Sequence, residues 1–171
     1  DAYFDFVYHH DWPNTLNELA KYRPRKVAPG ACDVRKMEKG CERGLDDGRV
    51  KAFLEALWKK PKISMAEGHA IMNICMAATY DPDPKAPNGF RLPFNLETGE
   101  MLEDAWRRWQ RHDPIHMVAK HAKALRSLRG IYVDCGSRDQ YHIHYGTRIL
   151  SKRLALAGIE HRYEEFDDTH S

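Results

Sequence analysis

Hydrophobic positions recur at helical spacing over most of the chain. Between residues 13 and 128, apolar side chains return every three or four positions in several stretches, which Pro and Gly residues separate. Ser64 and Glu67 have the spacing of a capping box, and Asp46 or Asp47 precedes another helical stretch as a cap. The first predicted helix starts at Pro13, and the second carries the apolar residues of 50–58. Three more helices are predicted over about 65–79, about 100–111 and 114–130.

The period changes after residue 130. Residues 130–136 form a short apolar run bounded by glycines, which is typical of a buried strand. Residues 161–166 alternate between polar and apolar and predict a second strand. A helix is predicted over 141–157, with Gly158 as its C-cap. Strand, helix and strand make a βαβ unit with parallel strands, so the predicted fold class is α/β.

The composition is that of a folded chain. Its 171 residues are 42% hydrophobic, which suffices for one domain with a core and excludes a disordered chain. No run approaches the roughly 18 apolar residues of a membrane-spanning helix. The 27 basic and 25 acidic residues leave a net charge of +2, which gives no reason to expect a nucleic acid or a membrane as partner.

Four cysteines are spread along the chain. Cys75 and Cys135 lie among apolar residues and are predicted to be small core residues. Cys32 and Cys41 lie in one polar loop and are able to pair in an oxidising compartment. The prediction favours the reduced state and a cytoplasmic protein.

Two polar loops follow the two predicted strands. Loop 136–141 contains Asp139, and loop 167–170 contains His170. Because the carboxyl ends of parallel strands lie at the same edge of a sheet, these two side chains are expected to meet. A carboxylate beside an imidazole fixes its tautomer and stabilises its protonated form, which is half of a nucleophilic triad. Asp134, in or at the end of the first strand, is the rival acid, with a structural role as its alternative.

The sequence shows no nucleophile for such a triad. In α/β-hydrolases the nucleophile lies upstream of the acid and the base, on a Gly-x-Ser-x-Gly turn. Five serines are present, and none lies in this motif: Ser64, Ser127, Ser137, Ser151 and Ser171. The sequence therefore predicts an acid and a base without the group that attacks.

Several runs carry a family resemblance: 132–141 (YVDCGSRDQY), 145–150 (YGTRIL) and 158–171, with further likeness at 80–84, 92–94 and 112–114. Together they resemble the C-terminal half of the esterase family that groups S-formylglutathione hydrolase or esterase D with feruloyl and enterochelin esterases. That family has the α/β-hydrolase fold. The likeness spans most of the chain and is strongest after residue 130. It implies that Asp139 is the triad acid and His170 the triad base.

The resemblance also implies an organisation. Residues 1–171 correspond to part of an α/β-hydrolase domain, with 13–128 as a mainly helical, cap-like insertion and 130–171 as the terminal strand–helix–strand unit. Family members carry the nucleophile and most of the oxyanion hole before a segment like 1–4, and one more helix after the triad histidine. We therefore expect the chain to need this N-terminal half, and to aggregate without it because an inner strand edge is bare.

The expected activity is hydrolysis of a small-molecule carboxylic ester by a serine esterase. An acyl-enzyme forms and water releases the acid, with no cofactor, so the chain alone is expected to be inactive. Two alternatives stay open. One is an acyltransferase of the same fold, and the other is a non-catalytic, esterase-like binding protein, which the missing serine motif fits.

Histidines outside the pair are weak candidates for metal ligands. His142 and His144 are two residues apart, so they do not share a helix face, and His112 and His116 flank Pro114. No Cys or Glu cluster completes a zinc set, and no metal site is predicted.

Aromatic residues gather near the start of the chain and in the predicted helices. Those near the start are expected in a core, with an acyl pocket as the alternative: Tyr3, Phe4, Phe6, Tyr8 and Trp12. A structural role is also favoured for His9 and His10, which follow the expected sixth strand of the family fold. Three tryptophans at helical spacing are predicted to be packing residues: Trp58, Trp106 and Trp109.

Overall fold

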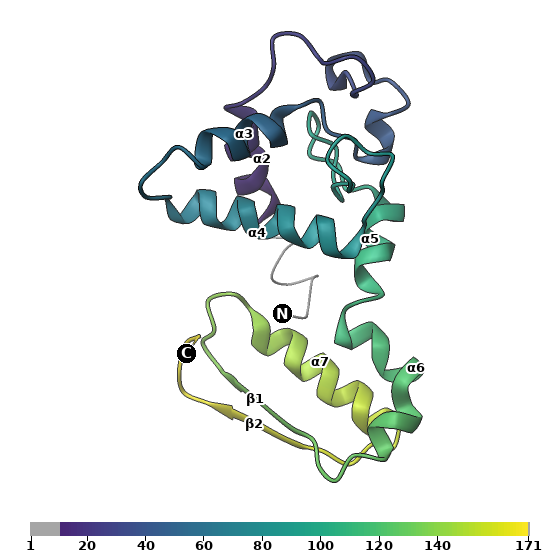
Figure 1. The fold of residues 1–171 in the computed structure, drawn as a ribbon. Helices are drawn as coiled ribbons and strands as arrows, with labels where there is room; N and C mark the ends of the chain where they lie inside the picture. The colour runs from purple at the N-terminus through teal and green to yellow at the C-terminus, as the bar shows by residue number, and fades with distance from the viewer. Residues whose placement is uncertain (1–10, 171) are drawn as a thin grey trace. The chain divides into compact units, whose positions relative to one another are not determined.

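The computed structural model describes residues 11–170, and the chain divides into two compact units. We call Asp11–Trp109 the helical unit and 110–170 the sheet unit. Both strands lie in the sheet unit (Figure 1). Helices together with two parallel strands agree with the predicted α/β class. The predictions made for Tyr3, Phe4, Phe6, Tyr8, His9 and His10 lie outside the described residues.

The helical unit is built from helices joined by long irregular segments. Its helices are α2 (Trp12–Ala20), the 3-10 helices η1 (Val34–Lys36) and η2 (Cys41–Arg43), α3 (Arg49–Leu57), α4 (Met65–Tyr80) and α5 (Glu103–Gln110). α2 packs against α3 and α4. The helix predictions for this unit are confirmed.

The capping box at the start of α4 is confirmed. The Ser64 hydroxyl accepts a hydrogen bond from the backbone N–H of Glu67 (3.2 Å), and the Glu67 carboxylate accepts one from the backbone N–H of Ser64 (2.8 Å). α4 buries Ala70 and Ala77. Cys75, however, is exposed, so its prediction as a core residue is wrong. The apolar run of α4 surrounds the helix, and such a pattern does not show which face points outward.

Aromatic rings form the centre of the helical unit. The Trp12 and Trp106 rings meet edge to face at 5.0 Å, and Phe94 lies 5.7 Å from Trp12. Trp106 and Trp109 are buried, which confirms them as packing residues. The same prediction is wrong for Trp58, whose side chain is 82% exposed. Trp58 caps the end of α3, where helical spacing no longer aims a side chain at the core.

Buried charges fix the start of α3. Arg49 is fully buried, and its guanidinium donates to Asp47 (2.8 and 2.9 Å) and to the carbonyl oxygen of Leu96 (3.0 Å). Asp46 accepts a hydrogen bond from the backbone N–H of Val50 (3.2 Å). Both predicted capping aspartates thus accept from the first turn, although Gly48 occupies the N-cap position itself.

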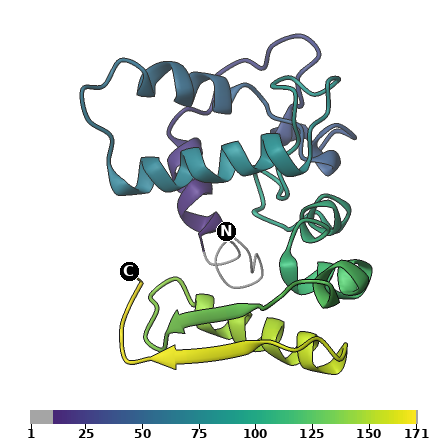
Figure 2. The same ribbon diagram turned by 60° about the horizontal axis from the view of Figure 1, so that its bottom comes forward.

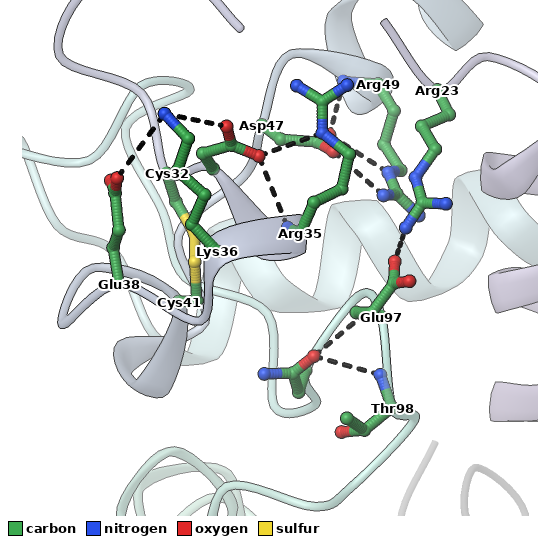
Figure 3. The surroundings of a disulfide bond; sticks show 12 residues. Arg23, Cys32, Arg35, Lys36, Glu38, Cys41, Asp47, Arg49, Glu97 and Thr98 are labelled. Atoms are coloured by element: carbon green, nitrogen blue, oxygen red, sulfur yellow. Dashed lines mark hydrogen bonds and ion pairs between the residues drawn. A yellow bond between two sulfur atoms is a disulfide. The ribbon is translucent and has the colours of Figure 1, made fainter.

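A disulfide joins Cys32 and Cys41 (Figure 3). Both residues are buried, and their Cα atoms are 5.4 Å apart. The sequence left this pairing open and favoured the reduced state, so the structure corrects that preference. Cys75 and Cys135 are free, and Cys135 is buried as predicted.

The sheet unit contains α6 (Pro114–Arg126), β1 (Tyr132–Gly136), α7 (Ile143–Leu156) and β2 (Arg162–Phe166). β1 and β2 are parallel, and both arrows point the same way in Figure 2. The predicted βαβ unit is confirmed. The chain divides at 109/110, which groups α6 with the strands rather than with the helices before it.

A small apolar core explains why α6 belongs to the sheet unit. Val118 of α6, Leu154 of α7 and Ile159 before β2 are buried together. α7 packs against both α6 and β1. Gly158, predicted as the C-cap of α7, instead follows the observed C-cap, Ala157, and has a φ of +64°. None of the helices within residues 11–170 is long and apolar enough to cross a membrane.

Candidate functional site

The loops after β1 and β2 lie against each other. The backbone N–H of Ser137 donates to the carbonyl oxygen of Phe166 (2.8 Å), and that of Arg138 donates to the carbonyl oxygen of Asp168 (2.9 Å). These bonds continue the parallel ladder past the ends of the strands. Side chains of the two loops are therefore held at one edge of the sheet, as predicted.

Gly136 permits this close approach. A Cβ atom at this position would lie less than 3.0 Å from the carbonyl oxygens of Asp168 and Thr169. These are backbone atoms of the neighbouring loop, so they cannot move aside as a flexible side chain does. Glycine at the end of β1 is thus a requirement of the site's geometry.

Asp139 and His170 meet across the two loops. The His170 Nδ1 atom lies 2.7 Å from the Asp139 Oδ2 atom. Asp139 is buried, whereas 45% of the His170 side chain is exposed. The other carboxylate oxygen, Oδ1, accepts a hydrogen bond from the backbone N–H of Tyr141 (2.7 Å). Asp139 is therefore fixed by its own loop and presents its second oxygen to the imidazole.

Two more residues orient His170. Its backbone N–H donates to the Gln140 side-chain oxygen (3.1 Å), and the Tyr141 ring meets the imidazole edge to face at 4.9 Å. With Nδ1 held by Asp139, the proton on Nδ1 points at the carboxylate and Nε2 is left as the basic nitrogen. Nε2 has no hydrogen-bond partner within residues 11–170. No pattern in the sequence predicts Gln140 or Tyr141 as an orienting group.

Asp139 remains ionised despite its burial. Burial raises the pKa of this carboxyl group. Hydrogen bonds from His170 and from the backbone N–H groups of Tyr141 and Ile143 lower the pKa by more than burial raises it. The net pKa lies below the ordinary value for aspartate. An ionised Asp139 accepts the Nδ1–H of His170 and so fixes the orientation of the imidazole.

Asp134 does not take part in this pair. It lies within β1 opposite Glu164, and its side chain is exposed. The structure therefore brings together Asp139 and His170, the pair that the loop positions and the family resemblance favoured.

The structure contains a contact between a histidine and a serine that the sequence does not predict. The His161 Nε2 atom lies 2.8 Å from the Ser151 hydroxyl of α7, and His161 Nδ1 lies 3.0 Å from the carbonyl oxygen of Ile159. His161 precedes β2, so this pair lies at the opposite edge of the sheet from His170. A separation of ten residues across a helix and a turn has no periodic signature.

The remaining histidines form no ligand set. The His142 and His144 rings are 6.4 Å apart. Within residues 11–170, no group of three or more His, Cys, Asp or Glu side chains is arranged to hold a metal ion.

Comparison with known proteins adds no family assignment. Neither a protein-family model nor a curated protein matches the chain.

Proposed function

We propose that the sheet unit supplies the acid and the base of a serine esterase with the α/β-hydrolase fold. The observation that carries the proposal is the 2.7 Å contact between Asp139 and His170 at the carboxyl edge of two parallel strands. This is the edge at which open α/β sheets collect their functional groups. Asp before His, separated by one helix and one strand, is also the order in α/β-hydrolases.

The mechanism follows from Nε2, the basic nitrogen of His170. Nε2 takes the proton of a serine hydroxyl while the serine oxygen forms a bond to the ester carbonyl carbon. Asp139 stabilises the imidazolium, which then gives the proton to the departing alcohol. Water then attacks the same carbon while Nε2 takes its proton. The bond to the serine oxygen breaks, the carboxylic acid leaves, and the serine oxygen takes the proton back from Nε2. No cofactor is needed for these steps.

The proposal places the nucleophile outside the 171 residues of this chain. None of the five serines lies on a Gly-x-Ser-x-Gly turn, and the N-terminal half of the family fold carries that turn. The substrate of the proposed enzyme is a small-molecule ester. The absent motif also supports the second candidate, an esterase-like binding protein without catalysis.

The disulfide bears on the predicted cytoplasmic location. Disulfides are rare in the cytosol and persist in oxidising compartments. The Cys32–Cys41 bond therefore weighs against that location. Localisation of the tagged protein by cell fractionation tests this point directly.

The activity is tested on the protein expressed from its complete reading frame. Hydrolysis of p-nitrophenyl esters is measured for the wild type, His170→Ala and His161→Ala. His170→Ala is expected to lose at least about 10⁴-fold in kcat, since the base is removed. His161→Ala is the matched control, because it removes another imidazole of the sheet unit that lies within hydrogen-bond distance of its neighbours, and it is expected to keep activity.

The outcomes separate the candidates. Activity that survives in His170→Ala and disappears in His161→Ala would move the site to the Ser151 pair and refute the proposal. A wild-type protein that binds esters without hydrolysing them would establish the binding-protein alternative. Thermal unfolding of both variants shows whether a lost activity reflects lost folding.

A further inference from the structure

A cavity of about 550 Å³ in the helical unit is lined by two basic pairs. Arg25 and Lys26 are neighbours in the segment after α2. Arg35 and Lys36 are the last two residues of η1. The lining also contains two carboxylates, those of Asp33 and Glu38. The cavity wall therefore carries an excess of two positive charges.

The carboxylates are already occupied by one of the two basic pairs. Asp33 accepts a hydrogen bond from the Arg35 guanidinium (2.9 Å), and the Lys36 ammonium lies 3.4 Å from Asp33 and 4.0 Å from Glu38. The contact between Lys36 and Glu38 lies beside the disulfide in Figure 3.

Arg25 and Lys26 carry the unbalanced charge. Both side chains are exposed, and neither has an ion-pair partner within the part of the chain that the structure describes. Two cations beside a concave surface, unpaired among residues 11–170, raise the positive potential there.

The backbone segments that carry the two basic pairs are tied together. The Arg35 guanidinium donates to the carbonyl oxygen of Arg25 (3.0 Å), which ties the two basic pairs side by side. The buried Cys32–Cys41 disulfide closes the loop around η1. An ordered loop loses little backbone entropy when a ligand binds, so the segments that carry these cations are pre-organised.

We propose that this cavity binds a small ligand with two or more anionic groups, such as a di- or polyphosphate, and that the disulfide keeps the cavity in shape. Guanidinium groups bind phosphate oxygens in pairs, and ammonium groups add point charges. The cavity has the size of a small-molecule site. Its excess of two positive charges matches a ligand with several negative charges better than a single carboxylate.

Calorimetric titration with inorganic pyrophosphate tests the proposal on the protein expressed from its complete reading frame. Arg25→Ala/Lys26→Ala is expected to weaken binding at least about tenfold, as two charged contacts are lost. Lys59→Ala/Lys62→Ala is the matched control, because it removes two exposed lysines of the same unit that do not line the cavity, and it is expected to bind normally. Raising the salt from about 50 mM to about 300 mM is expected to weaken binding.

Each part of the proposal has its own contrary result. Absent binding to the wild type, or equal losses in both double variants, would refute the site. Inorganic phosphate that binds as tightly as pyrophosphate would refute the requirement for two anionic groups. Cys32→Ser/Cys41→Ser is expected to lose affinity while keeping its helical circular dichroism, and unchanged affinity would refute the role of the disulfide.

Discussion

The two units hold their proposed sites in place with different forces. In the sheet unit, Asp139 and His170 follow two strands whose backbone hydrogen bonds set their positions. In the helical unit, the basic cavity lies in a segment with little regular structure, shaped by a disulfide and by side-chain hydrogen bonds. The first site depends on backbone register, and the second depends on a few individual side chains.

The two units also differ in the kinds of side chain that they bury. A cluster of aliphatic residues packs α6 and α7 together in the sheet unit. The helical unit adds the fully buried pair Asp47–Arg49, and Asp81 holds both Arg91 and Arg108. Apolar packing tolerates small changes, whereas a buried charge without its partner is costly. Single substitutions are therefore expected to act differently in the two units.

The largest effect is expected on kcat, from a substitution of Asp139 in the loop after β1. Asp139→Asn keeps the shape of the side chain but removes the charge that stabilises the protonated His170. The expected loss in kcat for ester hydrolysis is about 10⁴-fold, with thermal stability close to that of the wild type. Asp134→Asn, which changes the exposed aspartate of β1, is the control and is expected to keep full activity. Equal losses in both variants would deny Asp139 its special role.

The next effect is expected in the helical unit. Arg49→Met removes the cation from a fully buried pair and leaves Asp47 uncompensated. The free energy of unfolding is expected to fall by about 3–5 kcal/mol, measured by denaturant titration. Arg162→Met breaks an exposed pair with Glu164 in the sheet unit and is expected to change stability little. Similar losses in the two variants would remove the contrast between the cores.

A smaller effect is expected from backbone contact alone. Gly136→Ala places a methyl group against the carbonyl oxygens of Asp168 and Thr169. The expected cost is about 1–3 kcal/mol of stability, together with lower activity because the His170 loop must shift. Gly130→Ala is the control, since its added methyl group meets no atom within 4 Å. If the two alanine variants match in stability and activity, the close approach is unimportant.

The sequence could predict most of the elements and the central contact. The capping-box spacing of Ser64 and Glu67 predicts the start of α4. The change of hydrophobic period after residue 130 predicts the βαβ unit. The parallel arrangement of the two strands is then enough to predict that Asp139 lies beside His170. Each of these predictions needed only a local pattern and one rule of topology.

The sequence could not predict contacts that depend on how irregular segments close. Nothing in the spacing of Cys32 and Cys41 decides whether they are bonded. The Ser151–His161 contact crosses a helix and a turn, and the basic cavity joins residues ten positions apart through a hydrogen bond to a backbone carbonyl. Such contacts are set by the three-dimensional path of the chain rather than by a period.

The smallest expected effect concerns pH and again belongs to the helical unit. Hydrogen bonds from Lys60 and from Ser64 lower the pKa of Glu67 from 4.5 to about 2. A carboxyl group with a lowered pKa stabilises the folded state above its unfolded pKa, and this contribution is lost as the pH falls from about 4.5 towards 2. Glu67→Gln is expected to lose this component, so its unfolding temperature should depend less on pH in that window than that of the wild type. Glu55→Gln, which changes an exposed glutamate on α3, is the control and should follow the wild type. If Glu67→Gln follows the wild type as well, the capping box adds no pH-dependent stability to the helical unit.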